Sequence, residues 1–272
     1  MTAETVTLTG AKETLLITLY GKAEESRFPD SLLNDHFAAD AVRRLDYDFA
    51  RLSVRHDDMV ALAMRAKLFD RVTREFIAGH SDATVLHLGC GLDSRVFRID
   101  PPASVRWFDV DYPEVIALRR RVYPQREGYV MIGSSVTEPQ WIAEVPPDRL
   151  TLIVAEGLLP YLGQDEVPRL FERLTAHLRS GEIVFDGYSR LGLWLIRRNR
   201  LVRATGASLH WSIEDPRELE RQVPRLKFIG EYFTYDSAYL GRFSWPGRVA
   251  IQIFRAIPTL RKVGRLLRYR FG

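Results

Sequence analysis

The residues best suited to chemistry lie in the stretch 84–98, which reads TVLHLGCGLDSRVFR. A short apolar run, TVLHL, is followed at once by Gly89 and Gly91. Closely spaced glycines after a strand let a ligand approach the backbone where a Cβ would obstruct it. In α/β folds, such turns bind nucleotide-like cofactors at the carboxyl ends of parallel strands. The stretch therefore predicts a cofactor site at the end of a buried strand.

The residues around these glycines bear on which cofactor is bound. A dinucleotide fingerprint has glycine at three positions, G-x-G-x-x-G, and the third position here is Ser94. Asp109 and Asp111 follow at the distance of an acid that accepts hydrogen bonds from ribose hydroxyls. Ribose binding alone does not separate NAD from S-adenosylmethionine. Arg95 could pair with an amino-acid carboxylate, which favours S-adenosylmethionine.

Alternating strands and helices would position this stretch. Short apolar runs separated by helical segments imply a parallel sheet that is buried on both faces. The predicted strands are 84–88, 105–110, 129–132, 150–155 and 182–186. The predicted helices between them are 113–122, 139–144 and 165–178. Two later runs, 226–235 and 249–255, are expected to close the sheet as an antiparallel pair.

Helical patterns flank the predicted sheet on both sides. Apolar residues recur at helical spacing over 11–25, 32–45 and 59–78, and again over 192–206 and 216–223. We therefore expect a single domain, 1–272. Within it, 1–80 would form a helical cap, 81–187 the cofactor-binding core, 188–225 a helical lid inserted after the fifth strand, and 226–272 the closing strands and a basic tail.

Composition excludes several classes of protein. The net charge of +4 is mildly basic and the bases are scattered, so we expect no nucleic-acid partner. Cys90 is the only cysteine, so no intramolecular disulfide can form. The first ten residues lack the basic and apolar regions of a signal peptide, and no uncharged apolar run is long enough to span a bilayer. We therefore expect a cytoplasmic protein.

Four stretches together resemble one family. LGCGLDSRVFR, WFDVDYPEV, MIGSSVTEPQW and VAEGLLPYL, in this order and spacing, are similar to the leucine carboxyl methyltransferase family. The likeness runs over about 15–235 and is strongest to the bacterial branch of polyketide O-methyltransferases. It implies a class I methyltransferase fold, which is a Rossmann-like α/β fold with a seven-stranded, mostly parallel sheet and an antiparallel final pair. It also implies S-adenosylmethionine as cofactor.

The resemblance implies roles for single residues at the start of the site. Gly89 and Gly91 would form the floor under the cofactor. Arg95 would bind the methionine carboxylate, with help from a second base. That base would be Lys22 or Arg65, whose spacing from the family motif is looser.

The resemblance also implies contacts for the rest of the cofactor. Asp111 would hold the ribose hydroxyls, with Asp109 as the alternative. Glu156 would face the methionine amino group. In many relatives, an acid at the end of the third strand meets the adenine amino group. This chain has Ser134 and Ser135 there, so a hydroxyl or a backbone group would meet the adenine. The remaining residue expected at the cofactor, beside the amino group, is Gly157.

A general base is needed only for some acceptors. A carboxylate is ionised at neutral pH, whereas a phenol or an alcohol must lose a proton. The candidates are Tyr161, expected at the mouth between cofactor and acceptor, and the histidines His36, His56 and His210. Because none stands out, the sequence slightly favours a carboxylate. No spacing predicts a metal site. Apolar residues in 15–20, 34–37 and 188–211 predict a small, largely apolar acceptor.

Three other interpretations stay open from the sequence. A protein carboxyl methyltransferase would act on a peptide C-terminus and would need a partner surface. A nucleic-acid or membrane-surface binder would use the tail, where Arg261, Arg265 and Arg268 alternate with leucines as in a basic amphipathic helix. A solvated terminal helix that covers the sheet edge is the simpler interpretation of that tail. A homologue that binds cofactor without turnover would share the same residues, and the sequence leaves the oligomeric state open.

Overall fold

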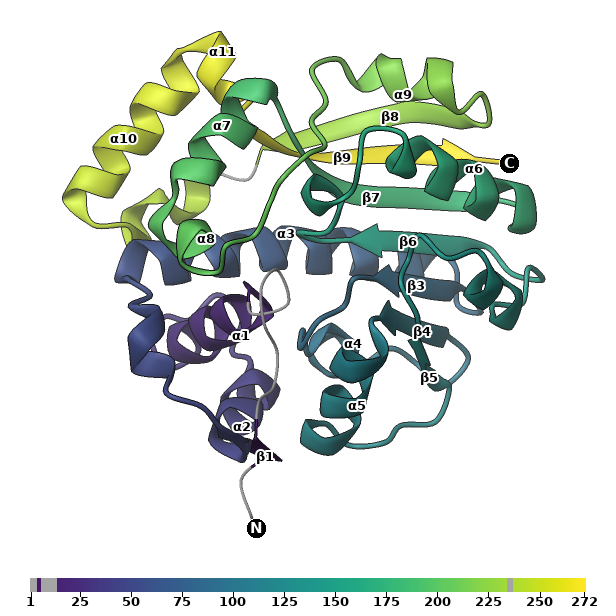
Figure 1. Ribbon diagram of the computed structural model, residues 1–272, viewed down its shortest axis with the longest axis horizontal. Coiled ribbons are helices and arrows are strands. Elements are labelled where there is room, and N and C mark those ends of the chain that lie inside the picture. Colours follow the sequence, from purple (N-terminus) through teal and green to yellow (C-terminus); the bar gives the residue numbers. More distant parts are fainter. Residues whose placement is uncertain (1–3, 6–13, 234–236) are drawn as a thin grey trace.

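A seven-stranded sheet lies at the centre of the computed structural model, which describes residues 4–5, 14–233 and 237–272 (Figure 1). The strand order is β5-β4-β3-β6-β7-β9-β8. The first five strands in this order are parallel, and β9 is antiparallel to both of its neighbours. The bounds are β3 Thr84–Leu88, β4 Arg106–Asp111, β5 Tyr129–Gly133, β6 Thr151–Ala155, β7 Gly181–Tyr188, β8 Leu226–Phe233 and β9 Gly264–Phe271. The predicted fold class is confirmed.

Helices surround this sheet, and a short parallel pair, β1 (Glu4–Thr5) and β2 (Leu45–Asp46), lies apart from it. The α-helices are α1 Thr14–Glu25, α2 His36–Arg44, α3 His56–Gly79, α4 Arg95–Ile99, α5 Pro113–Val122, α6 Glu166–His177, α7 Arg190–Arg198, α8 Arg200–Ala204, α9 Pro216–Gln222, α10 Trp245–Ala256 and α11 Pro258–Arg261. Short 3-10 helices are η2 Phe49–Leu52, η3 Gln140–Glu144, η4 Leu159–Tyr161 and η5 Ser237–Arg242. Figure 1 shows α7, α8, α10 and α11 gathered at the end toward which the parallel strands point.

The central strands are buried on both faces, which explains their continuous apolar sequence. All residues of β3 and β6 are buried. Val85 and Leu152 belong to one hydrophobic cluster, together with α1, α3 and α5. Leu86 and Ile153, one residue further along, belong to a second cluster with η3, α6 and α9. Because successive side chains of a strand point to opposite faces, the same strands anchor both helical layers.

An ion pair lies inside the first of these layers. Asp109, on β4, is 0% exposed, and its Oδ2 lies 2.6 Å from Nη2 of Arg119 on α5. Trp107 Nε1 donates to Oδ1 over 2.8 Å, and Tyr129 Oη donates to Oδ2 over 2.5 Å. Burial would raise the pKa of Asp109, but Arg119, His87 and Tyr129 outweigh it and lower the pKa. Asp109 thus holds α5 onto the sheet.

The strand predicted over 249–255 is wrong, because this segment lies within α10. The sequence VAIQI places apolar residues at alternate positions, as in a strand. Ser244 nevertheless caps a helix here by accepting a hydrogen bond from Gly247 N over 3.3 Å. Pro246 follows in the first turn, where its fixed φ suits a helix start. The N-cap at Ser244 and the proline after it therefore favour a helix, despite the alternating apolar pattern of the sequence.

In the tail, which was predicted as a basic amphipathic helix or as a solvated helix at the sheet edge, 255–261 lies in α10 and α11, and 264–271 is the strand β9. It lies between β7 and β8 and not at an edge. Its bases are used inside the fold: Arg265 is 2% exposed and donates to Ile213 O over 3.1 Å and to Glu231 Oε2 over 3.0 Å. Arg268 Nε donates to Glu182 Oε2 over 2.5 Å. Arg265 and Arg268 are therefore engaged within the fold.

Smaller corrections concern helix ends. The helix predicted over 192–206 is divided into α7 and α8 at Asn199, whose side chain accepts from Leu201 N over 2.8 Å and begins the second helix. The predicted helix start at 11–13 and the predicted strand end at 234–235 lie outside the described residues. The divisions 1–80, 81–187, 188–225 and 226–272 stay predictions.

The paired carboxylate on β4 gives a prediction for stability. We expect Asp109→Asn to lower the free energy of unfolding at pH 7 by about 3–5 kcal/mol, because Arg119 would be left buried without its partner. The folded pKa of Asp109 is depressed, so its stabilisation is complete above the unfolded value of about 4 and is lost as the pH falls below it. Urea unfolding at several pH values measures both effects.

The matched control for this prediction is Asp100→Asn, which removes an exposed partner of Arg126. An exposed pair contributes only about 0–1 kcal/mol. The structural role assigned to Asp109 is wrong if the two variants are equally stable. It is also wrong if the loss of unfolding free energy in Asp109→Asn becomes larger below about pH 4.

The position of β9 gives a second prediction. We expect deletion of residues 264–272 to abolish cooperative thermal unfolding, because β7 and β8 both lose their antiparallel neighbour. Deletion of Gly272 alone, which lies beyond the strand, should leave the transition in place. Circular dichroism during heating compares the two. A sharp transition in the longer deletion would contradict the observed strand order.

Candidate active site

Two glycines in the left-handed region form the turn after β3. Gly89 has a φ of 59° and Gly91 a φ of 51°, which other L-residues adopt at a cost in free energy. A Cβ on Gly89 would lie 2.8 Å from Leu158 Cδ1. The N–H of Gly91 donates to Asp111 Oδ2 over 2.7 Å. The turn is therefore held to the end of β4 by one of the acids predicted to bind ribose.

A cavity of about 440 Å³, here called the central cavity, opens where the five parallel strands end. Ligands of open α/β sheets bind at this edge. Its wall includes these residues predicted for the site: Lys22, Arg65, Gly89, Gly91, Asp111, Ser134, Ser135, Glu156, Gly157 and Tyr161. The predicted residues outside the wall are Arg95, Asp109, His36 and His210. The fold thus brings residues from distant parts of the chain to one cavity.

Glu156, which follows β6, is surrounded by three cations. Its Oε1 lies 3.3 Å from Lys22 Nζ and 3.1 Å from Arg65 Nε, and its Oε2 contacts Arg95 Nη2. Burial alone would raise the pKa of Glu156, but attraction to Lys22, Arg95 and Arg65 holds it well below its usual range. Glu156 is therefore a carboxylate at neutral pH and offers the cavity a fixed negative charge.

Arg95 lies behind the cavity wall, which corrects its predicted role. Its guanidinium is 0% exposed and pairs with Asp70 Oδ1 at 2.9 Å and Asp93 Oδ2 at 3.2 Å. Arg95 opens α4, and its side chain points into the core, over the ring of Phe69. The cations that line the cavity are Lys22 and Arg65. A carboxylate in the cavity would meet these two, and Arg95 positions Glu156.

Charged residues at and behind this wall form a buried ionic network, whose members are Lys22, Asp35, Arg65, Asp70, Asp93, Arg95, Arg98, Glu156 and Asp186. Arg98 joins Asp35 and Asp70, each at 2.6 Å. Asp35 also caps α2 by accepting from Ala38 N over 2.9 Å. The network therefore ties α1, α2, α3 and α4 to the ends of β6 and β7.

Sequence reasoning missed several members of this network. Asp70 lies on the buried side of α3, four residues after Ala66 and three before Thr73, both of which are fully buried. A single acid on the apolar face of a predicted helix is a signal that could have found it. Arg98 follows Arg95 by one helical turn, which is a similar signal.

Asp186, also missed, ends the fifth predicted strand and supports the cavity. Its Oδ1 accepts from Gly157 N over 2.7 Å, and its Oδ2 accepts from Tyr188 Oη over 2.9 Å and lies 3.3 Å from Arg65 Nη1. Burial raises the pKa of Asp186, and Arg65 opposes that shift only in part. An acid that ends a buried strand at the ligand edge was the available signal.

The two acids on β4 have different surroundings. Asp111 lines the central cavity and accepts Gly91 N and Tyr112 N on its two oxygens. Burial raises its pKa, although these backbone donors oppose the shift. Asp109 is not in the cavity wall, because it lies two residues further from the strand end and its carboxylate is buried against Arg119. Of the two predicted ribose ligands, only Asp111 is placed to reach a ligand.

The predicted base candidates are scattered. Tyr161 lines the central cavity, and burial raises the pKa of its phenol. His210 is exposed and outside the wall, and it contributes a backbone N–H to Pro160 O. His56 is exposed too, and its Nε2 lies 2.8 Å from Arg242 O. Of the predicted histidines, none lines the central cavity among its described residues.

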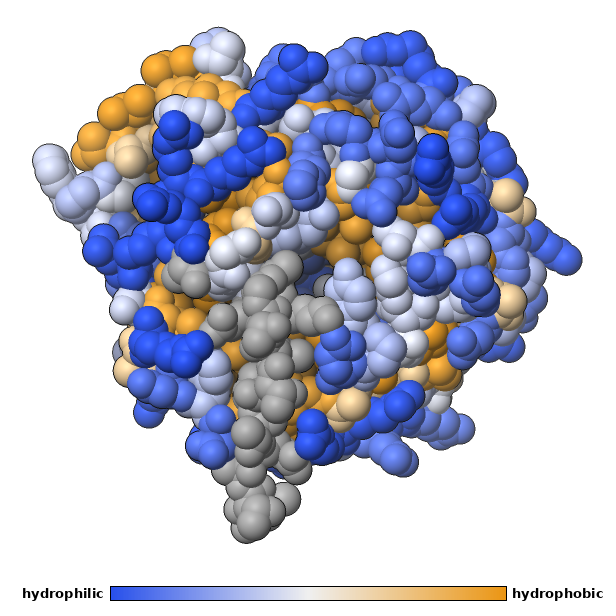
Figure 2. Space-filling view, viewed as in Figure 1, coloured by the Kyte–Doolittle hydropathy of each residue, from blue (hydrophilic) through white to orange (hydrophobic). Residues whose placement is uncertain are grey.

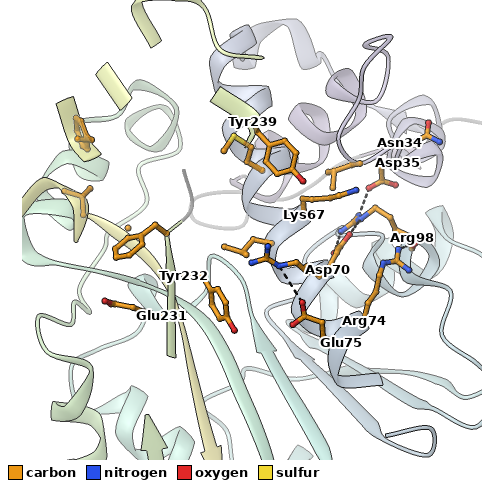
Figure 3. A pocket seen from close by; sticks show the side chains of 18 of the residues that line it. Asn34, Asp35, Lys67, Asp70, Arg74, Glu75, Arg98, Glu231, Tyr232 and Tyr239 are labelled. Carbon is orange, nitrogen blue, oxygen red and sulfur yellow. Dashed lines mark hydrogen bonds and ion pairs between the residues drawn. The ribbon is translucent and has the colours of Figure 1, made fainter. Parts of the chain in front are cut away.

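His36 belongs to a second hollow of about 850 Å³, here called the lateral cavity. It lies between α3 and β8, with α2, α4 and α10 at its sides (Figure 3). Figure 3 shows Tyr232 of β8 across the cavity from Lys67 and Asp70 of α3. The segment 34–37, predicted to contact the acceptor, lines this cavity and not the central one. Both cavities share the segment 263–264.

The segment after β7 contributes an apolar part to the central cavity. Ile196, Leu201, Val202 and Leu209 line it, beside Leu62 of α3. The two tryptophans of this segment do not line it: one is 47% exposed under the guanidinium of Arg198, and the other packs on Phe185 in the core. Of the predicted segment 188–211, the cavity wall therefore takes aliphatic side chains and Tyr188, and not the tryptophans.

Two further properties concern the part of the chain that the structure describes. No group of three or more His, Cys, Asp or Glu side chains there is arranged to hold a metal ion. No helix there combines the length and apolar character needed to cross a membrane.

Comparison with known proteins assigns the family. The profile of the leucine carboxyl methyltransferase family matches residues 16–130. The chain is 45% identical to the tetracenomycin polyketide synthesis O-methyltransferase TcmP of Streptomyces glaucescens, over 98% of this chain and 99% of that protein. It is 38% identical to the S-adenosyl-L-methionine-dependent methyltransferase dpfgK of Gibberella zeae, over 88% of each chain.

A solved structure shares the fold of this chain. The crystal structure of a methyltransferase from Thermobifida fusca superposes with a TM-score of 0.61 at 17% identity, covering 97% of this chain and 95% of that one. This likeness supports the fold alone, whereas the identity to TcmP over nearly the whole chain carries the assignment. The protein belongs to the leucine carboxyl methyltransferase family.

Proposed function

We propose that this chain is an S-adenosylmethionine-dependent O-methyltransferase that methylates a carboxylate of a small, largely apolar, polyketide-like acceptor. One observation carries the proposal. A single cavity combines the cations Lys22 and Arg65, the carboxylate Glu156, and Asp111 beside a glycine turn. That combination matches a ligand with an amino-acid end and a ribose.

The charges suit the methionine end of the cofactor. This end is a zwitterion, so it needs a cation and an anion side by side. Lys22 and Arg65 suit its carboxylate, and Glu156 suits its ammonium group, through charge-assisted hydrogen bonds. The side chains are already in place through the network, so little ordering is required on binding.

The other end of the cavity suits the nucleoside. Asp111 keeps acceptor capacity on both oxygens after its two backbone contacts, and ribose hydroxyls can donate to it. Ser134 and Ser135 offer hydroxyl and backbone groups to the adenine at the end of β5. When bound, S-adenosylmethionine supplies a sulfonium methyl group that an oxygen nucleophile can displace. The protein's contribution is alignment and exclusion of water.

The choice of a carboxylate acceptor is supported by the histidine and the two tyrosines of the described wall that we consider as bases, none of which is suitable. His87 is the histidine on that wall, and its Nε2 lies 3.2 Å from Arg95 Nη1. Tyr161 and Tyr188 have raised pKa values because they are buried, so they are protonated and poor bases. A phenol or alcohol acceptor would need a base here. A carboxylate is ionised without one.

The cofactor assignment predicts a selective loss of affinity. We expect Arg65→Gln to weaken binding of S-adenosylmethionine by about ten- to a hundredfold, since a charged hydrogen bond contributes about 1.5–3 kcal/mol. Binding of 5′-methylthioadenosine, which lacks the amino-acid carboxylate and ammonium, should change little. Isothermal titration calorimetry with both ligands measures the difference.

The matched control is Arg71→Gln, which makes the same change on the same helix but faces the lateral cavity. Its affinities should equal those of the wild type. An equal loss of affinity for both ligands in Arg65→Gln would mean general damage to the site. An unchanged affinity for S-adenosylmethionine would exclude the binding of its carboxylate by Arg65.

The acceptor assignment predicts which oxygen is methylated. We offer the enzyme 3-hydroxy-2-naphthoic acid, which carries a carboxyl and a phenol on one apolar ring system. The expected product is the methyl ester, which mild alkali hydrolyses, and not the methyl ether. Mass spectrometry before and after alkali distinguishes them. Activity should stay level from about pH 6 to 8, because the carboxylate is ionised throughout. A methyl ether would overturn the carboxylate assignment.

A further inference from the structure

Helix α10 is attached to the protein by one side only. Ile251, which is 7% exposed, packs with Val60 and Met64 of α3. The start of the helix is fixed by Asp57, which accepts from Ser244 N over 2.8 Å and from Ser244 Oγ over 2.6 Å. The helix is thus a firmly anchored element whose other side faces outward.

The outward side carries a stripe of large apolar residues. Trp245 is 71% exposed, Val249 38%, Ile253 50% and Ile257 42%. They recur every four residues: Trp245, Val249 and Ile253 lie on one face of α10, and Ile257 follows at its C-cap. Figure 2 shows apolar surface along the outer edge of the molecule over α10. We call these four residues the α10 stripe. Single exposed apolar residues are common on proteins, but an aligned row of four with a tryptophan indicates an interaction site.

The charged residues of the segment that carries the α10 stripe are all of one sign. Residues 237–263 contain no Asp or Glu, and their bases are Arg242, Arg248, Arg255, Arg261 and Lys262. Arg242 pairs with Asp30 at 2.9 Å, and Arg261 lies over the ring of Phe233. Arg248 and Arg255 are exposed and form no ion pair with a described residue. The surface therefore combines a row of apolar side chains with positive charge.

This chemistry discriminates between possible partners. In a symmetric dimer the same helix would face itself, so Arg248 and Arg255 would meet bases and no acid of the partner helix. A stable protein interface buries roughly 800 Å² on each partner, more than four side chains on one helix provide. A lipid surface needs only a few apolar side chains that enter it and bases that meet its phosphates.

We propose that α10 docks this enzyme on an anionic lipid surface. The α10 stripe enters the boundary between headgroups and acyl chains, and Arg248 and Arg255 meet lipid phosphates beside it. The helix lies in the plane of the surface and does not cross it. Phe254 and Arg255 also line the lateral cavity, so that hollow lies beside α10 on the side away from the α10 stripe. The surface is independent of the cofactor site, so this proposal stands whichever oxygen the enzyme methylates.

The test is co-sedimentation with vesicles of phosphatidylcholine alone and of phosphatidylcholine mixed with phosphatidylglycerol. We expect the full-length protein to bind the mixed vesicles and to release them as salt is raised. Ile253→Glu should bind at least about tenfold more weakly, because it puts a charge into the apolar layer. Arg248→Gln with Arg255→Gln should weaken binding roughly thirtyfold, because each base near an anionic surface contributes about 1 kcal/mol.

The matched control is Ile229→Glu, which makes the same change at a 41% exposed isoleucine on β8. It should sediment like the wild type. Thermal unfolding and S-adenosylmethionine binding should be equal for all variants, which shows that they are folded. The proposal is overturned if the wild type binds neither vesicle, or if Ile229→Glu loses binding as strongly as Ile253→Glu. It is also overturned if light scattering finds a dimer that Ile253→Glu dissociates, because the stripe is then a contact between copies.

Discussion

The carboxylate of Glu156, held among three cations, is the interaction on which the rest of the site depends. Burying an ion costs several kcal/mol, so the charge at the end of β6 has to be matched by groups from other elements. Lys22 comes from α1, Arg65 from α3 and Arg95 from α4. Apolar residues of similar size could hold these helices as firmly. They would remove from the cavity wall the charges of Lys22, Arg65 and Glu156, which the proposed function requires.

The core of the fold and much of the site could be predicted from the sequence. The central strands β3 and β6 were recognisable because strands buried on both faces read as uninterrupted apolar runs. Gly89, Gly91, Asp111 and Glu156 were recognisable because ligand residues follow such strands directly. Arg95 was misassigned because closeness along the chain does not fix direction. The strand-to-helix turn sends this side chain into the core, and the cations that reach the cavity come from distant helices.

The closing strands could not be predicted in the same way. An alternating apolar pattern fits a strand, but apolar residues on two sides of a helix alternate as well. In α10, Ile251 faces the protein and Ile253 faces outward. The alternating pattern therefore comes from apolar residues on two different faces of the helix. In β9, arginines among leucines looked like one side of a helix. Their partners, such as Glu182 and Glu231, are far away in the sequence and become visible only in the folded sheet.

The place of β9 between β7 and β8 also governs when the sheet can form during synthesis. The ribosome adds about 5–20 residues per second, and the N-terminal layers can assemble as they emerge. The final strand to be made is an interior one, so β7 keeps an open edge until residues 264–271 leave the exit tunnel. Open edges invite pairing with other chains. The sheet is therefore closed only after residues 264–271 have emerged and paired with both β7 and β8.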